Sequence, residues 1–325
     1  MKKIFITLLL SVFTGIANAD DPWLVFEGKD GPGKGQHIVL ISGDEEYRSE
    51  EALPMLGKLL AQRHGFKCTV LFAINAETGE IDPNEQTNIP NMQAVSDADF
   101  VIVALRFREL PDQDMKHLVD YVQAGKPILG LRTSTHAFRY KRNKESPYAR
   151  WSFNSDGGFG KKILGETWIN HHGHHGKEST RGVIDEKQSD HPLLTGVKDV
   201  WGPTDVYGVK SLPDDAVVLM HGRVLAGMNP DDPAVEGKKN DPMMPVAWIR
   251  EPEVNGTKQK IICSTMGAAT DLVHPGLRRF VVNSAYWVTG LEIPQDLNVN
   301  PVDSYEPTQF GFNKFQKGKN PSDYR

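Results

Sequence analysis

The sequence predicts an α/β protein with a mostly parallel β-sheet and helices packed on both of its faces. Three nearly continuous apolar runs, at 37–42, 66–73 and 99–105, have the pattern of strands that are covered on both sides. A helical pattern follows the first run and the third. Strands and helices that alternate at this spacing indicate parallel strands joined by crossovers.

The helices are predicted from apolar residues on one helical face and from the glycines that end them. Gly65 closes the first helix and Gly125 the second, because glycine adopts the left-handed conformation that ends helices. A third helix is expected over 275–289, with Gly290 after it. The apolar positions of the first two helices are Leu53, Leu56, Leu59, Leu60, Met115, Leu118, Val119 and Val122. Further strands are expected at 126–129, 216–220, 245–249 and 260–264.

The turn after the strand at 126–129 is the part of the chain that points most directly to a site. It reads Gly-Leu-Arg-Thr-Ser-Thr-His-Ala-Phe over 130–138, a strand that ends in glycine and enters small hydroxyl residues. This pattern resembles a nucleophile elbow, but Arg132 stands where a Ser or Cys would be. A guanidinium binds or polarises oxygen and does not act as a nucleophile. We therefore expect replacement of Arg132 by Ala to abolish function and to leave stability nearly unchanged.

Polar side chains follow several of the predicted strands, and the carboxyl ends of parallel strands meet at one edge of a sheet. Carboxylates beside guanidinium groups suit the recognition of sugar hydroxyls, and a carboxylate can also transfer protons. The catalytic candidates are Glu45, Glu46, Arg132 and His136. The substrate-binding candidates are Arg48, Arg106, Arg108, His172, Asp205 and Tyr207.

Each candidate also has a structural interpretation. Glu45 and Glu46 precede a helix, where acidic residues complement the helix dipole. Arg106 and Arg108 alternatively form a structural ion network with nearby acids, and His136 alternatively caps the next turn. The sequence leaves both interpretations open.

Four histidines within 171–175 raise the question of a metal, because neutral imidazole binds zinc and related ions. Gly173 and Gly176 disfavour a helix there, and in an extended loop His172 and His174 share a side. These two are the candidate ligands of a divalent metal; the alternatives are an ordinary polar rim and metal-free contact with a substrate. No Gly-x-Gly-x-x-Gly follows a strand, so no nucleotide cofactor is expected.

The N-terminal segment and the net charge indicate where the protein acts. Residues 1–19 combine two lysines, a short apolar run and Ala17-Asn18-Ala19, which is typical of a secretory signal peptide. We expect cleavage after Ala19 and a soluble protein in the periplasm or outside the cell. The net charge of −5 argues against a nucleic-acid partner, and no later run is long enough to insert into a membrane.

Two flanking segments and two cysteines complete the sequence predictions. Residues 20–35 are expected to follow the surface, and 293–325 to form an extended tail pinned to the surface by aromatic residues. Cys68 and Cys263 lie in apolar, strand-like runs, which leaves two alternatives: two buried thiols or one disulfide.

Four stretches together resemble the ThuA-like family, which is named for trehalose utilisation. They are the apolar run at 37–42, the turn at 130–138, the segment 201–207 and Ser-Thr-Met-Gly-Ala at 264–268. The similarity spans roughly 36–292 and is greatest to the exported branch of the family. It implies a three-layer, flavodoxin-like fold related to class I glutamine amidotransferases. It also implies a role in carbohydrate catabolism, with a disaccharide or a keto derivative as the small saccharide partner.

The chain departs from true amidotransferases in two ways: Arg132 replaces the nucleophilic cysteine, and no His-x-Glu follows late in the chain. Glutamine hydrolysis is therefore not expected. Three hypotheses remain. The first is a saccharide-directed enzyme, a hydrolase or an isomerase, that uses acid–base chemistry. The second is a non-catalytic carbohydrate-binding protein, and the third is a metal-dependent hydrolase that uses the loop 171–175.

Overall fold

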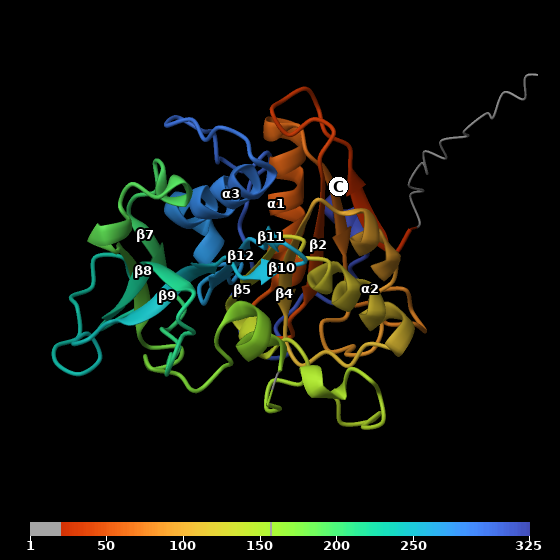
Figure 1. The fold of residues 1–325 in the computed structure, drawn as a ribbon, viewed down its shortest axis with the longest axis horizontal. Helices are drawn as coiled ribbons and strands as arrows, with labels where there is room; N and C mark the ends of the chain where they lie inside the picture. The colour runs from red at the N-terminus through yellow and green to blue at the C-terminus, as the bar shows by residue number, and fades with distance from the viewer. Residues whose placement is uncertain (1–20, 157) are drawn as a thin grey trace, which may run out of the picture.

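The predicted parallel strands form the centre of one ten-stranded sheet (Figure 1). The computed structural model describes residues 21–156 and 158–325, so the predicted signal peptide lies outside the described residues. Five neighbouring strands run parallel, in the order β3-β2-β4-β5-β12. Their bounds are β3 Lys67–Leu71, β2 His37–Gly43, β4 Phe100–Leu105, β5 Ile128–Leu131 and β12 Ile261–Ser264.

The rest of the sheet is antiparallel, and this differs from the mostly parallel sheet that the sequence predicts. Next to β12 the order continues β9-β8-β6-β7, with antiparallel pairing at each step. No helix lies between β8 and β9, so the chain returns without the crossover that parallel strands require. These strands are β9 Met244–Arg250, β8 Ala216–Leu225, β6 Ser179–Ile184 and β7 Val200–Gly202, and a small hairpin pairs β10 Glu253–Val254 with β11 Thr257–Lys258.

Helices cover both faces of the parallel strands (Figure 1). Helices α1 (Ser49–His64) and α3 (Pro275–Thr289) pack in the same core cluster as Ile38 and Leu40 of β2. Helix α2 (Asp112–Gln123) packs on the other face, in the cluster of Val39 and Ile41. Successive residues of β2 thus point to opposite cores, which explains its continuous apolar run.

The ends of the predicted helices are confirmed. Gly65 follows α1 with a φ of 83°, and Gly290 follows α3 with a φ of 75°. Both are in the left-handed region, where glycine is the least strained residue. The remaining helical turns are short: η1 Met92–Asp97, η2 Arg132–His136, η3 Ala149–Trp151, η4 Gly160–Leu164, η5 Glu186–Gln188, η6 Pro192–Leu194, η7 Asp271–Val273 and η8 Pro321–Tyr324.

Strand β1 (Trp23–Phe26) lies within 20–35, where the sequence predicts only a surface course. It pairs antiparallel with β3 and forms one edge of the sheet, with Trp23 opposite Leu71. Four residues are too few to show a clear alternation of apolar and polar positions, so the sequence pattern does not reveal this strand.

The two cysteines are buried and unpaired. Cys68 belongs to the core on the α1 side of the sheet and Cys263 to the core on the α2 side. The sheet separates them, so the disulfide alternative is wrong. Among residues 21–156 and 158–325, no helix is both long enough and apolar enough to cross a membrane.

The C-terminal tail lies against the folded chain through aromatic rings. Phe310 stacks on Tyr47 at 5.6 Å, and Tyr324 stacks on Phe72 at 6.3 Å between ring centroids. The hydroxyl of Tyr305 donates to the carbonyl of Ala269 at 3.0 Å.

Candidate functional site

A cavity of about 330 Å³ lies at the carboxyl edge of the parallel strands. Glu46 follows β2, Arg106 follows β4 and His136 follows β5, and all three line the cavity. His171, His175 and Tyr207 reach it from the second half of the chain. The strand ends therefore gather part of the predicted site, as expected of a parallel sheet.

Arg132 lies beneath this cavity rather than in its wall. It adopts a φ of 46°, in the left-handed region, so the chain turns sharply where β5 ends. Its Nη1 donates to the carbonyls of Asp205 and Thr265, both at 2.8 Å. Its Nη2 donates to the hydroxyl of Tyr47 and to Oδ1 of Asp205, both at 3.0 Å.

Two aromatic rings enclose the same guanidinium. Its carbon lies 3.8 Å from the centroid of Tyr207 and 4.5 Å from that of Tyr47. The side chain is 1% exposed and all four Nη hydrogens have partners, so none is free to bind a substrate. The prediction of Arg132 as a catalytic residue is corrected accordingly: it supports the site from below.

Arg108 and Arg48 are also structural, which corrects their prediction as substrate-binding residues. Arg108 is fully buried and donates to the carbonyls of Pro83 and Glu85 and, at 2.9 Å, to Oε2 of Glu45. Arg48 is fully buried as well. Its Nη2 donates to three carbonyls, those of Glu45, Glu46 and Gly311.

Glu45 and Glu46 are adjacent in sequence but differ in their surroundings. Glu45 pairs with both Arg106 and Arg108 and does not line the cavity, so the ion-network interpretation applies to it. Glu46 lines the cavity; its carboxylate lies 3.7 Å from Nε of Arg106 and 3.4 Å from Nε2 of His175. Burial and the nearby Asp44 raise the pKa of Glu46 above its ordinary value.

Asp205 anchors two imidazoles at the base of the cavity. Its Oδ2 lies 2.7 Å from Nδ1 of His171, and its Oδ1 lies 3.1 Å from Nδ1 of His175. Burial acts to raise the pKa of Asp205, but Arg132 and the two imidazoles hold it well below its ordinary value. The hydrogen bond to Asp205 raises the pKa of His175.

The predicted metal pair, His172 and His174, is not the pair that the fold brings to the site. Nε2 of His172 lies 2.9 Å from the carbonyl of Lys239, and the side chain of His174 is 70% exposed beside Glu178. A bend at 172–173 breaks the extended course that the prediction assumes, and it turns His171 and His175 to the same side.

Among the described residues, His171, His175 and Asp205 each offer one donor atom, and these atoms lie within 4.8 Å of one another. The sequence prediction named Asp205 as a substrate-binding residue and the loop 171–175 as a possible metal site, but it chose His172 and His174 from that loop as the ligands. Their pairing depends on the bend and on a carboxylate about thirty residues away, and no local pattern signals either.

His136 faces the cavity as a buried imidazole. Burial, together with Arg106, Arg132 and His171, holds its pKa well below the ordinary value, so the ring is neutral near pH 7. Its Nδ1 lies 3.3 Å from the hydroxyl of Thr135. Among the described residues, no group forms a hydrogen bond with Nε2.

Aromatic rings form the remaining walls. Trp168 lies 5.5 Å from the ring of His136, and Phe107 lies 5.1 Å from it. The guanidinium of Arg106 packs 4.4 Å from the ring of Phe107 and 4.9 Å from that of Phe312, which is 52% exposed.

Phe312 belongs to the C-terminal tail, which the sequence analysis did not assign to the site. The backbone at Gly311 fixes the tail there: its N–H donates to the carbonyl of Glu46 at 2.7 Å, and its carbonyl accepts from Arg48 at 2.8 Å. Gly311 has a φ of 133°, a conformation in which a side chain is strained.

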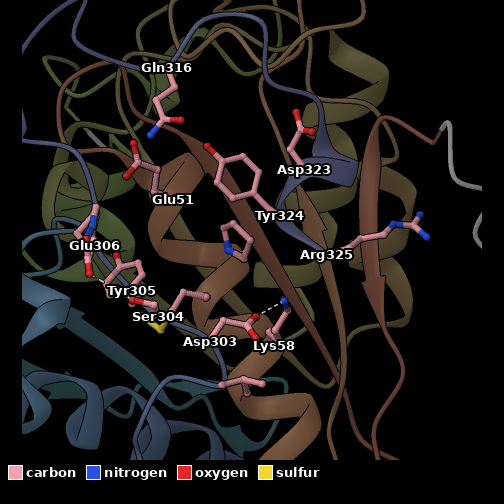
Figure 2. Close-up of a pocket in the computed structure, with 14 residues that line it drawn as sticks. Glu51, Lys58, Asp303, Ser304, Tyr305, Glu306, Gln316, Asp323, Tyr324 and Arg325 are labelled. Atoms are coloured by element: carbon pink, nitrogen blue, oxygen red, sulfur yellow. Dashed lines mark hydrogen bonds and ion pairs between the residues drawn. The ribbon is translucent and has the colours of Figure 1, made fainter.

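A second cavity, of about 280 Å³, lies between α1 and the tail (Figure 2). Figure 2 shows the ring of Tyr324 between Glu51 and Asp323. The carboxylate of Glu51 accepts from the backbone and hydroxyl of Thr308, and Asp303 pairs with Lys58. Because these carboxylates are engaged in holding the tail, the cavity at Glu46 is the better candidate for chemistry.

Comparison with known proteins identifies similar folds among solved structures. No family model and no curated protein matches the chain. A candidate ThuA-like protein from Parabacteroides merdae ATCC 43184 is similar in structure, with a TM-score of 0.51 and 12% identity over 90% of this chain and 99% of that chain. Another from Bacteroides uniformis ATCC 8492 has a TM-score of 0.49 and 14% identity over 80% and 93% of the two chains. This chain therefore has an α/β fold like that of the Parabacteroides merdae protein.

Proposed function

We propose that this chain is an exported ThuA-like protein of carbohydrate catabolism, with a three-layer fold of the flavodoxin-like, class I amidotransferase-like type. Its cavity at Glu46 binds a disaccharide or a keto derivative and acts on it by acid–base chemistry. The motif at 130–138 and the structural likeness to a candidate ThuA-like protein support the family part of this proposal.

One observation carries the chemical part: proton-transferring groups and aromatic rings share the same walls. Glu46, His136 and His171 line a cavity that Trp168 and Phe312 also line. Aromatic rings pack on the apolar face of a sugar, while carboxylate and imidazole groups bind its hydroxyls.

The roles follow from what each group faces. Glu46 is the carboxylate at the cavity and transfers the proton. Arg106 lies beside it and binds substrate oxygen, and the neutral imidazole of His136 offers Nε2 to a hydroxyl. A glutaminase activity has no support, because the elbow presents the buried guanidinium of Arg132 and no nucleophile.

The test compares two neighbouring carboxylates in protein that begins at Asp20. Turnover and binding are measured with trehalose, other disaccharides and their keto derivatives. Glu46→Gln is expected to lower turnover by about 10²- to 10⁴-fold, the usual contribution of a proton-transferring residue, with the thermal midpoint nearly unchanged.

Glu45→Gln is the matched control, and it is expected to lower the thermal midpoint because it breaks the pair with Arg106 and Arg108. Sugar binding without turnover in the native protein would favour the non-catalytic carbohydrate-binding hypothesis. Turnover that survives Glu46→Gln would remove Glu46 from the proposed mechanism.

A further inference from the structure

The imidazole of His175 lies between two carboxylates. Its Nε2 is 3.4 Å from Oε1 of Glu46, and its Nδ1 is 3.1 Å from Oδ1 of Asp205. A neutral imidazole carries one N–H, so it can donate to only one of these carboxylates. At the other contact two lone pairs would face each other, unless a proton or a metal ion lies between them.

We propose that His171, His175 and Asp205 bind a divalent transition metal of the zinc class. Two imidazoles and one carboxylate are a ligand set that catalytic zinc sites use. The Nδ1–oxygen separations are 2.7 Å for His171 and 3.1 Å for His175. Zinc–nitrogen bonds of about 2.0–2.1 Å in a tetrahedron place donor atoms about 3.3 Å apart. The three donor atoms already lie within 4.8 Å of one another, so side-chain rotations that even out these separations accommodate the ion.

The groups behind these ligands fit a metal centre. Glu46 faces the far nitrogen of His175, the position where a carboxylate commonly orients a metal-bound histidine. Arg132 donates to Oδ1 of Asp205 and so fixes the carboxylate, and each of its two oxygens still has a lone pair that can face the ion. The positive charge of Arg132 is offset by Asp205 at 3.0 Å and by the nearby Glu46.

The trio leaves one coordination position open toward the cavity. His171 and His175 line the cavity, while Asp205 is 1% exposed and lies beneath them. Three protein ligands with an open fourth position are typical of catalytic rather than structural zinc. Only the identity of the fourth ligand, a water or a sugar oxygen, rests on the proposed function; the metal site itself rests on these three side chains.

The loop supplies matched controls for the test. Protein from Asp20 onward is stripped with a chelator, dialysed, and titrated with ZnCl₂ and CoCl₂ by calorimetry. We expect one ion per chain, a rise in thermal midpoint on binding, and the visible absorption of four-coordinate cobalt. His171→Ala and His175→Ala are each expected to weaken binding at least 100-fold, whereas His172→Ala and His174→Ala retain it.

Binding that survives His171→Ala, or that His172→Ala removes equally, overturns the site. The absence of binding at about 100 μM zinc also overturns it and indicates that a proton on His175 fills the gap. Turnover of a saccharide by metal-free protein that binds no zinc would leave the proposed function standing without this inference. Zinc binding in a protein that binds no saccharide would leave the metal site standing without the proposed function.

Discussion

The floor and the wall of the cavity use similar polar residues in different ways. By the floor we mean three arginines that support the lining residues without lining the cavity themselves: Arg48, Arg108 and Arg132. They are buried and donate to backbone carbonyls and to neighbouring side chains. In the wall, Glu46 and His171 have protein partners on one side and the cavity on the other. A polar residue at a strand end is therefore functional only if some of its donors or acceptors remain available to a ligand.

The largest expected effect is the loss of stability on replacing Arg132, which belongs to the floor. Arg132→Met leaves the carboxylate of Asp205 buried without its cationic partner and is expected to lower the free energy of unfolding by about 3–5 kcal/mol. Urea denaturation measures this loss. This prediction is the opposite of the sequence-based expectation that stability would stay nearly unchanged, because Arg132 is buried and pairs with Asp205.

Arg142→Met is the control, because the side chain of Arg142 is 61% exposed and its pair with Glu109 contributes about 0–1 kcal/mol. If Arg132→Met removed activity at a cost in stability no greater than that of Arg142→Met, Arg132 would belong to the wall.

His64 is a buried imidazole that lies away from the cavity, at the amino ends of the parallel strands, and all its contacts are structural. His64 ends α1; its Nδ1 lies 3.0 Å from the hydroxyl of Tyr286 and its Nε2 lies 2.9 Å from the carbonyl of Asn298. Burial lowers the pKa of His64 from 6.5 to about 4.

The imidazole of His64 binds a proton more readily in the unfolded chain than in the folded protein. Its contribution to the free energy of unfolding is therefore complete above about pH 6.5 and is lost as the pH drops toward 4. The expected loss is about 3 kcal/mol at most. Urea denaturation from pH 7 to pH 4.5, in the native protein and in His64→Gln, isolates the contribution of His64 to the pH dependence of the free energy of unfolding. Equal slopes in the two proteins would show that His64 does not titrate in this range.

The sequence was sufficient to predict the parallel strands of the sheet, but it did not predict which side chains at their carboxyl ends are available to a ligand. The apolar runs and Gly65 mark strands and a helix end through local patterns, and the fold confirms them. The burial of Arg132 depends on rings at Tyr47 and Tyr207, which lie far away in sequence. No spacing rule relates residues that meet only through tertiary packing.

The same limit explains two wall features that the sequence prediction did not identify: the pairing of His171 with His175, and the position of Phe312. His171 and His175 face the cavity because of a bend between them, and the prediction assumed an extended loop. Phe312 reaches the cavity because the tail returns across the end of β2, where Gly311 pairs with the backbone of Glu46. A Pro- and Asn-rich segment carries no sequence signal of where it will lie.

The smallest expected effect tests whether the tail belongs to the wall. Phe312 is 52% exposed, so a bound sugar can cover its ring. Covering about half of a phenylalanine contributes about 1 kcal/mol, and Phe312→Ala is therefore expected to weaken sugar binding about fivefold. Its effect on stability is expected to be small because the ring is already half in water.

Phe315→Ala is the matched control, because Phe315 lies in the same tail but outside the cavity at Glu46. Calorimetric titration of both variants with the best-bound disaccharide separates contact with the sugar from loosening of the tail. A selective loss in Phe312→Ala would place the tail in the wall. An equal loss in both variants would mean that the tail acts only by holding Gly311 against Glu46, which would make it part of the floor.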